Sequence, residues 1–210
     1  AADESLASTP AIVASTVVFW RSAWKYRTRG YRYCFWDNGT VLSNLLASVN
    51  SLGLPARVLA GFVDADVDKL LGVDSEEEAS TCLVALGQKS GAQPYVVKAL
   101  AEIEKGGLCF SDPIPYPESD QLHSESCLIS ADEVHDWRGH AHGQETRFIT
   151  DLESGALGDA ILDRGSTRRF SRENITLAQL TALLAASSAN MTADFGGGLT
   201  EPYLIVNAVE

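Results

Sequence analysis

Residues 20–39 read WRSAWKYRTRGYRYCFWDNG, and this stretch guides the interpretation of the rest of the chain. Aromatic residues are interspersed in it with five cationic ones: Arg21, Lys25, Arg27, Arg29 and Arg32. The whole chain has a formal net charge of -12, yet a second segment, RGSTRRFSR at 164–172, is also basic. Positive charge gathered in this way favours a binding site for an anion, and aromatic neighbours favour a flat one. The alternative is a pair of basic surface faces balanced by nearby acidic side chains.

The composition is typical of a globular protein with one large domain or two small ones: 210 residues, 45% hydrophobic and 21% charged. An isoelectric point near 4.7 disfavours nucleic acid as a partner, because binding phosphates requires a basic face. The longest apolar run, residues 11–20, is too short to cross a bilayer, so no membrane partner is expected. The first five residues do not resemble a signal peptide, and the cysteines form no CxxC pair. We therefore expect reduced thiols and a cytoplasmic protein.

Hydrophobic periodicity predicts both strands and helices in the first half of the chain. The predicted elements are a strand at 11–19, a helix at 41–52 that ends at Gly53, a strand or extended stretch at 56–62, a helix N-capped by Asp64 that ends at Gly72, and a strand at 81–87.

The second half differs in character. Its predicted elements are an amphipathic helix at 93–105, a proline-rich linker within 109–150 with a short helix opened by Ser130 and Glu133, a helix at 156–163, a helix capped by Thr176 and Gln179, and a final strand at 203–209.

The segment that begins at Arg164 carries a resemblance. Its pattern, Arg164-Gly165-Ser166-x-Arg168-x-Phe170, resembles the N-terminal signature of the FMN-dependent nitroreductase family. The resemblance implies that Arg164, Gly165, Ser166 and Arg168 bind the FMN phosphate. A doubly charged phosphate suits guanidinium donors combined with a hydroxyl. The alternative interpretation is a basic loop that follows a helix.

Residues 24–74 resemble the C-terminal half of the same family, and most closely its SagB-type dehydrogenase branch. The shared pattern is R-x-Y-R-Y, D-x-G, N-L-L, L-G-L, G-F-x-D and L-L-G in that order. By this resemblance, Ala60 and Gly61 lie along the flavin with a backbone N–H near N5. A small residue followed by glycine permits the close approach that hydride transfer requires.

The azoline oxidases of that branch carry an adjacent Lys-Tyr pair, proposed as the base that removes a substrate proton. Lys25 and Tyr26 stand at the matching place. Positive neighbours favour the neutral form of a lysine, which is the form that a general base needs. The alternative is that Lys25 is a solvated member of the basic cluster and Tyr26 a wall residue.

The order of the two halves is reversed relative to a complete family member. We interpret the chain as a piece of a tandem protein, with residues 1–108 as the C-terminal half of a first domain, 109–150 as linker, and 151–210 as the N-terminal part of a second. The family forms dimers with flavin at the interface, so a homodimer or an intramolecular pseudo-dimer is expected. The second part lacks the family's usual R-x-x-P-S-x-G-A stretch.

The resemblance implies an α+β, nitroreductase-like fold with a central mixed β-sheet flanked by helices. It also implies an FMN-dependent oxidoreductase that transfers hydride through flavin N5, with NAD(P)H as electron donor or with azoline oxidation in a modified peptide. The substrate would be a small molecule or a peptide. No metal is expected, because the spacing of the histidines fits no closed zinc site. The alternative function is a flavin-free scaffold that dimerises or binds a peptide.

Overall fold

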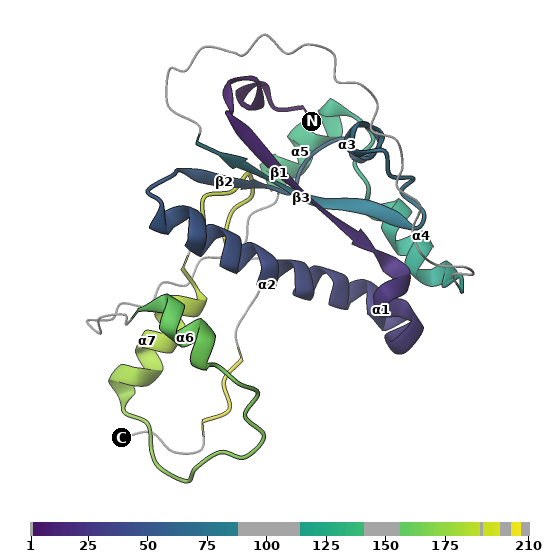
Figure 1. The fold of residues 1–210 in the computed structure, drawn as a ribbon. Helices are drawn as coiled ribbons and strands as arrows, with labels where there is room; N and C mark the ends of the chain where they lie inside the picture. Colours follow the sequence, from purple (N-terminus) through teal and green to yellow (C-terminus); the bar gives the residue numbers. More distant parts are fainter. Residues whose placement is uncertain (1, 88–113, 141–155, 190, 198–202, 207–210) are drawn as a thin grey trace. The chain divides into compact units, whose positions relative to one another are not determined.

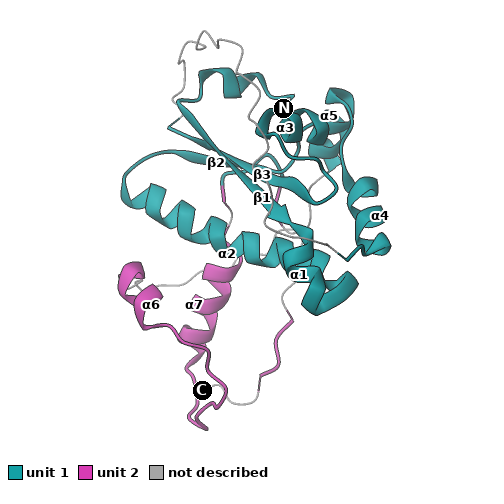
Figure 2. Ribbon diagram, turned by 45° about the vertical axis from the view of Figure 1, so that its right-hand side comes forward, with its two compact units in different colours: residues 1–141, 192–195 teal, residues 142–191, 196–210 magenta. Residues whose placement is uncertain are grey.

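The computed structural model describes residues 2–87, 114–140, 156–189, 191–197 and 203–206. These residues fall into two compact units, which Figure 2 colours separately. Unit 1 comprises residues 1–141 with 192–195, and unit 2 comprises 142–191 with 196–210. In the part of the chain that is described, no helix is long and apolar enough to span a membrane.

Unit 1 is built on a three-stranded sheet with the order β1-β3-β2. The strands are β1 (Ala11–Val18), β2 (Ala56–Leu59) and β3 (Glu78–Leu86), and both pairings are antiparallel. The register sets Ala11 and Ala56 opposite Leu86, with an irregularity in β1 at Ser15 and Thr16. All three strands were predicted from their apolar runs.

Helices cover both faces of the sheet (Figure 1), so the α+β prediction is confirmed. Alternate residues of β3 point to opposite sides, as the pleat of a strand requires. Cys82 and Val84 pack with leucines of α2 (Gly30–Ser51). Leu83 and Ala85 pack on the other side with residues of α3 (Asp64–Leu71) and the 3-10 helix η1 (Glu4–Ser8).

The predicted mixed character of the sheet needs a correction. Every pairing between the named strands is antiparallel. The one parallel pairing among the described residues is an isolated bridge between Val58, on the open edge of β2, and Ala193. Strand direction depends on which distant segments meet, and the local apolar pattern does not encode it.

The basic-aromatic segment forms two helices and the turn between them. Helix α1 (Phe19–Tyr26) ends at Arg27, whose φ of 54° lies in the left-handed region, and η2 (Arg27–Arg29) leads into α2. The chain crosses itself closely here, because a Cβ on Gly30 would lie 2.7 Å from the Cα of Ala23. Phe19, Tyr31 and the residues packed with them bury the inner side of this turn.

Local signals located several helix ends, but α2 begins at Gly30 and not near residue 41. Gly53 follows α2 with φ 65°, and Gly72 ends α3 with φ 72°, as predicted. Asp64 is the first residue of α3 and not its N-cap, which is Val63. The carboxylate of Asp64 accepts a hydrogen bond from the backbone N–H of Leu128 at 2.8 Å, so a distant segment takes the oxygen that a cap would use.

Two further helices belong to unit 1, α4 (Pro117–Ser126) and α5 (Ala131–His140). Ser130 accepts from the N–H of Glu133, but the Glu133 carboxylate accepts from the N–H of Ile129, so only half of the expected capping box forms. Both helices lie within the predicted linker at 109–150. The division into halves of two domains stays a prediction.

Unit 2 contains α6 (Leu157–Asp163) and α7 (Leu177–Ser187). The capping box of Thr176 and Gln179 is complete, as predicted. The predicted strand at 203–209 is not observed at 203–206, where the described residues form no ladder with another strand. Its last three residues, like the predicted helix at 93–105, lie outside the described residues.

Candidate functional site

The backbone amides of Ala60 and Gly61 form a pair of donors just beyond the end of β2. The N–H of Ala60 donates to Oδ1 of Asp194 at 2.8 Å, and the N–H of Gly61 donates to Oδ2 of the same side chain at 3.2 Å. Two successive N–H groups that converge on one carboxylate are a binding element for an anion or another strong acceptor. The sequence resemblance assigned both residues to a cofactor site.

Asp194 reaches these amides from a short segment, Thr192–Phe195, that lies along the open edge of β2. The N–H of Val58 donates to the carbonyl of Thr192 at 2.8 Å, and the N–H of Asp194 donates to the carbonyl of Val58 at 3.0 Å. Ala193 and Phe195 pack against Val58 and its neighbours in the core. The segment is thus held by backbone pairing and by apolar contact as well as by its carboxylate.

Arg138 supplies the positive charge of this site. Its Nε donates to Oδ2 of Asp194 at 2.9 Å, and its Nη2 donates to the carbonyl of Gly61 at 2.8 Å. Nη2 also lies 3.4 Å from Oδ2 of Asp3. Burial raises the pKa of Asp3, but hydrogen bonds from Ser5 and Arg57, with the charge of Arg57, outweigh burial and lower the pKa overall. Asp3 therefore stays ionised as a second partner of Arg138.

Trp137 covers the face of Gly61. A Cβ built on Gly61 would lie 2.7 and 2.8 Å from two carbons of the Trp137 ring. The ring also meets Phe195 in an edge-on arrangement, with centroids 6.4 Å apart. The family resemblance implies that a flavin lies along this glycine, whereas in the structure the indole of Trp137 from α5 lies there.

The predicted Lys25–Tyr26 pair ends α1 and lies in an exposed aromatic row. The Nζ of Lys25 is 5.1 Å from the centroid of the Tyr26 ring, and that ring is 4.4 Å from the ring of Tyr33. Arg29 donates to the Tyr33 hydroxyl at 3.0 Å. A cavity of about 600 Å³ opens in the same segment, lined by Thr28, Arg29, Tyr31, Arg32, Tyr33, Phe35, Trp36 and Leu122. Arg29 and Arg32 are the cationic residues of its lining, and the expected anion site in this segment stays a prediction.

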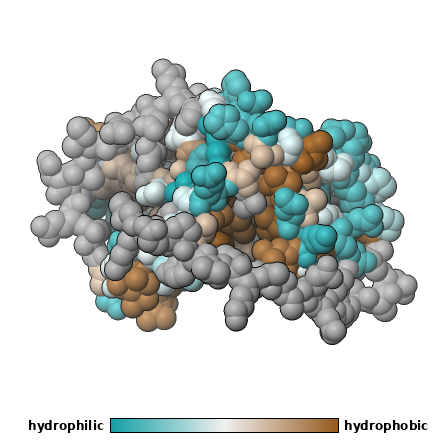
Figure 3. Space-filling view, turned by 90° about the horizontal axis from the view of Figure 1, so that it is seen from above, coloured by the Kyte–Doolittle hydropathy of each residue, from teal (hydrophilic) through white to brown (hydrophobic). Residues whose placement is uncertain are grey.

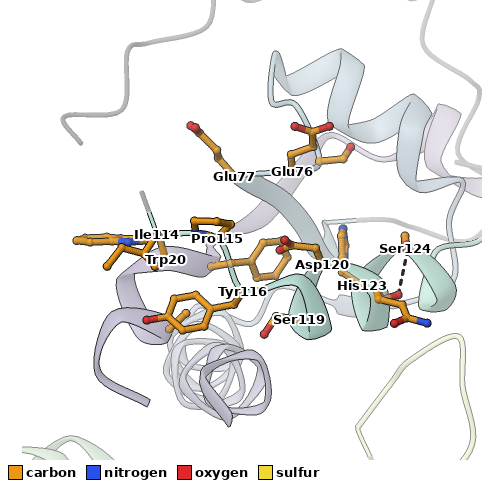
Figure 4. Close-up of a pocket in the computed structure, with 14 residues that line it drawn as sticks. Trp20, Glu76, Glu77, Ile114, Pro115, Tyr116, Ser119, Asp120, His123 and Ser124 are labelled. Atoms are coloured by element: carbon orange, nitrogen blue, oxygen red, sulfur yellow. Dashed lines mark hydrogen bonds between the residues drawn. The ribbon is translucent and has the colours of Figure 1, made fainter. Parts of the chain in front are cut away.

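A second cavity, of about 620 Å³, lies between the start of α1, the turn before β3, and α4 (Figure 4). Trp20, Tyr116 and His123 contribute rings, whereas Glu76, Glu77 and Asp120 contribute carboxylates. Burial lowers the pKa of His123, which favours a neutral imidazole. Its acidic residues make this cavity unsuited to a phosphate.

The surface seen from above is mixed. Hydrophobic residues gather near the middle of this face, with hydrophilic residues above them and to their right (Figure 3). Within the described residues, no group of three or more His, Cys, Asp or Glu side chains could hold a metal ion.

The expected phosphate-binding residues Arg164, Gly165, Ser166 and Arg168 lie in unit 2, between α6 and α7, and all are exposed. The amide pair of Ala60 and Gly61 lies in unit 1. The structure therefore does not bring the two expected parts of a flavin site together within one compact unit.

Sequence reasoning missed Asp194, Arg138 and Trp137. Asp194 is separated from Gly61 by 133 positions and Arg138 by 77, so no local motif links them. Trp137 lies in the short helix predicted to open at Ser130, and no site role was predicted for it. A large aromatic residue next to an arginine was the available signal, and it is too common to identify a site.

Residues 3–88 match the sequence model of the Nitroreductase family. This range contains Lys25, Tyr26, Ala60 and Gly61, whereas the segment at 164–172 lies outside it. Over 63 residues the chain is 33% identical to the microcin B17-processing protein McbC of Escherichia coli, which corresponds to 30% of this chain and 23% of that protein.

The fold is also similar to that of a solved structure. A candidate nitroreductase from Anabaena variabilis superposes with a TM-score of 0.60 at 24% identity, over 86% of this chain and 38% of the other. The chain thus spans about a quarter of the length of McbC and less than two fifths of the solved structure.

Proposed function

We propose that the protein is an FMN-dependent oxidoreductase of the nitroreductase kind, because residues 3–88 match the Nitroreductase family model and the fold is similar to that of a solved candidate nitroreductase. When bound, FMN supplies two-electron chemistry by accepting or giving hydride at N5. NAD(P)H would be the electron donor for a substrate that is reduced, whereas an azoline that is oxidised would itself be the donor. The cytoplasm is the proposed location.

The observation that carries this proposal is the amide pair of Ala60 and Gly61. The two N–H groups converge on acceptor oxygens at 2.8 and 3.2 Å, so the backbone can present donors to one acceptor group. The ring of Trp137 lies so close to Gly61 that a Cβ would overlap it, so a flat ring system can reach this backbone. Both properties fit the edge and plane of a flavin ring.

Other residues have proposed roles that follow the family resemblance. Arg164, Gly165, Ser166 and Arg168 would hold the phosphate, since their exposed cationic and hydroxyl groups suit a doubly charged anion. Lys25 and Tyr26 would hold or move a proton of the substrate, and the aromatic row beside them would offer ring surfaces to it. Since these groups occur in two units, a second copy of the chain or a second domain would complete the site.

The proposed substrate is a peptide that carries an azoline ring. The support is the similarity to McbC, whose name describes processing of the peptide microcin B17. Oxidation would transfer a hydride from the ring to FMN and a proton to a base beside the cofactor, and an external two-electron acceptor such as molecular oxygen would take the electrons from the flavin. Lys25 is the proposed base.

One observation favours a second candidate function, a flavin-free scaffold that dimerises or binds a peptide. Asp194 already accepts from both amides that a flavin would use. A chain that has lost its cofactor could retain this closed arrangement as a structural element.

Equilibrium dialysis against FMN separates the two functions. We expect saturable binding by the wild-type protein and at least about tenfold weaker binding by Arg164→Ala, because a charge-assisted contact with phosphate is lost. Arg169→Ala is the matched control, since this residue lies in the same segment but outside the Arg164-x-Ser166-x-Arg168 pattern. No binding by the wild-type protein, with its fold intact, would favour the scaffold.

A further inference from the structure

The site at the end of β2 is built for a carboxylate. We propose that the N–H groups of Ala60 and Gly61 together with Arg138 form a carboxylate-binding site whose resident ligand is Asp194, and that a carboxylate and a flavin exclude each other there. The carboxylate site stands on the contacts alone, whereas the exclusion of flavin rests on the proposed function.

Both oxygens of the Asp194 carboxylate are used. One accepts from Ala60, and the other accepts from Gly61 and from Nε of Arg138. The side chain of Asp194 is only 2% exposed, so these three donors replace the water that a free carboxylate would hold. Charge-assisted contacts of this kind are stronger than hydrogen bonds between neutral groups.

Arg138 is fixed by groups other than Asp194. Its guanidinium donates to the carbonyls of Gly61 and Ala2 at 2.8 and 3.2 Å, and it lies 3.4 Å from the Asp3 carboxylate. The arginine and the amide pair would therefore keep their positions when Asp194 leaves. A vacated site would be a preorganised receptor for another carboxylate.

The resident ligand also defines the kind of segment that fits. Residues 192–195 read Thr-Ala-Asp-Phe and pair with the edge of β2 through two backbone hydrogen bonds. Ala193 and Phe195 pack against the core beside Val58. The site accepts an extended peptide in which an aspartate is followed by an aromatic residue, which is recognition by strand addition.

A flavin at this site would need the two amide hydrogens and the space that residues 192–195 occupy. Each amide carries one hydrogen, and both hydrogens point to Asp194. In addition, the indole of Trp137 lies against Gly61 and contacts the ring of Phe195. Binding a flavin at these amides therefore requires residues 192–195 to leave. The apparent affinity for flavin is therefore the intrinsic affinity multiplied by the fraction of molecules in which residues 192–195 have left the site.

Two variants test the proposal, Asp194→Ala and Asp194→Asn. Asn retains one carbonyl oxygen but loses the charge that Arg138 binds. Asp159→Ala is the control, because Asp159 is an exposed acidic residue on α6 of unit 2. Two readouts are measured on the full chain: hydrogen–deuterium exchange of the Ala60 and Gly61 amides without flavin, and FMN affinity by flavin fluorescence.

We expect faster exchange of the two amides in Asp194→Ala, an intermediate rate in Asp194→Asn, and no change in the control. FMN should bind about tenfold more tightly to Asp194→Ala than to the wild-type protein. Added acetate should weaken FMN binding to Asp194→Ala, with sodium chloride at equal ionic strength as reference, but should leave the wild-type protein unaffected.

Unchanged exchange in both variants would overturn the carboxylate site. Faster exchange of the two amides together with unchanged or weaker FMN binding would overturn the competition between Asp194 and flavin. It would still support the carboxylate site. If no form of the protein binds FMN, the proposed function fails, and the exchange rates still decide whether Asp194 occupies the amides. If Asp194→Ala does not fold, as judged by circular dichroism, Asp194→Asn decides by the same readouts.

Discussion

Replacing Gly61 with alanine tests how closely the Trp137 ring approaches the proposed flavin-facing backbone. The new Cβ would lie 2.7 Å from Cε3 and 2.8 Å from Cζ3 of Trp137, and 3.3 Å from Oδ2 of Asp194. Carbon atoms in contact prefer separations of about 3.5–4.0 Å, so the ring must move by roughly 1 Å. The rigid indole cannot yield by bending, and its own contact with Phe195 resists the movement.

Overpacking of this size costs about 1–3 kcal/mol. For a protein of this length, each kcal/mol lowers the melting temperature by about 2–4 °C. We therefore expect Gly61→Ala to melt several degrees below the wild-type protein. The matched control is Gly39→Ala in α2, where a Cβ meets no atom within 4 Å. Alanine in a helix interior should stabilise the protein by about 0.5–1 kcal/mol.

Urea denaturation of four proteins assigns the cost to the right contact: wild type, Gly61→Ala, Trp137→Leu and the double variant. In the Trp137→Leu background, Gly61→Ala should lose most of its cost, because the smaller and flexible side chain leaves room for the Cβ. An equal cost in both backgrounds, or no cost in either, would refute the close approach of the indole to Gly61.

Three further predictions concern other parts of the molecule. Gly30→Ala should destabilise unit 1 by more than about 2 kcal/mol in urea denaturation, because the Cβ would meet the backbone of Ala23 at 2.7 Å; a neutral effect would contradict the close crossing of α1 and α2. Burial raises the pKa of Asp64 to about 6 from 3.8, so the folded protein binds more protons than the unfolded chain between about pH 4 and pH 6, and stability falls as pH rises through that window. Between pH 4 and pH 7 the wild-type protein should lose about 1 kcal/mol of unfolding free energy through Asp64, after allowance for solvent screening, and Asp64→Asn should not show this loss. An Asp64→Asn variant with the same pH profile as the wild type would contradict the burial of Asp64. Thr176→Ala should destabilise α7 by about 1 kcal/mol, seen as faster amide exchange at the start of the helix, whereas unchanged exchange would show that the cap contributes nothing.

The elements that the sequence located correctly depend on neighbouring residues. Gly53 and Gly72 adopt positive φ where the helices end, and such positions favour glycine for a local steric reason. The capping box at Thr176 needs only Gln179, three residues away. Apolar runs identified all three strands, because a strand in the core is buried whichever segments of the chain pair with it.

The errors and omissions depend on contacts between distant residues. Asp64 has the right side chain for an N-cap, yet its oxygen is taken by Leu128, 64 positions away. The direction of the strands and the parallel bridge at Val58 depend on which segments meet in space. The carboxylate at the Ala60–Gly61 amides comes from residue 194, and no spacing in the sequence connects the two.

The candidate site also has residues that a local pattern identifies and residues whose relation depends on distant contacts. The resemblance identified Ala60 and Gly61 through a pattern within about fifty residues, and the structure gives them a defined donor geometry. Lys25 and Tyr26 were identified in the same way, and their roles remain predictions. The phosphate-binding residues were identified by a short motif in unit 2, so their relation to the amides depends on assembly that no local pattern specifies.

We propose that this chain binds FMN at a nitroreductase-like site. The most direct test is the visible absorbance spectrum of the purified protein, recorded before and after addition of FMN and after removal of the excess. We expect a shifted flavin spectrum that remains with the protein and saturates near one flavin per site. A protein that stays colourless after the excess is removed, while its circular dichroism shows an intact fold, would contradict the claim.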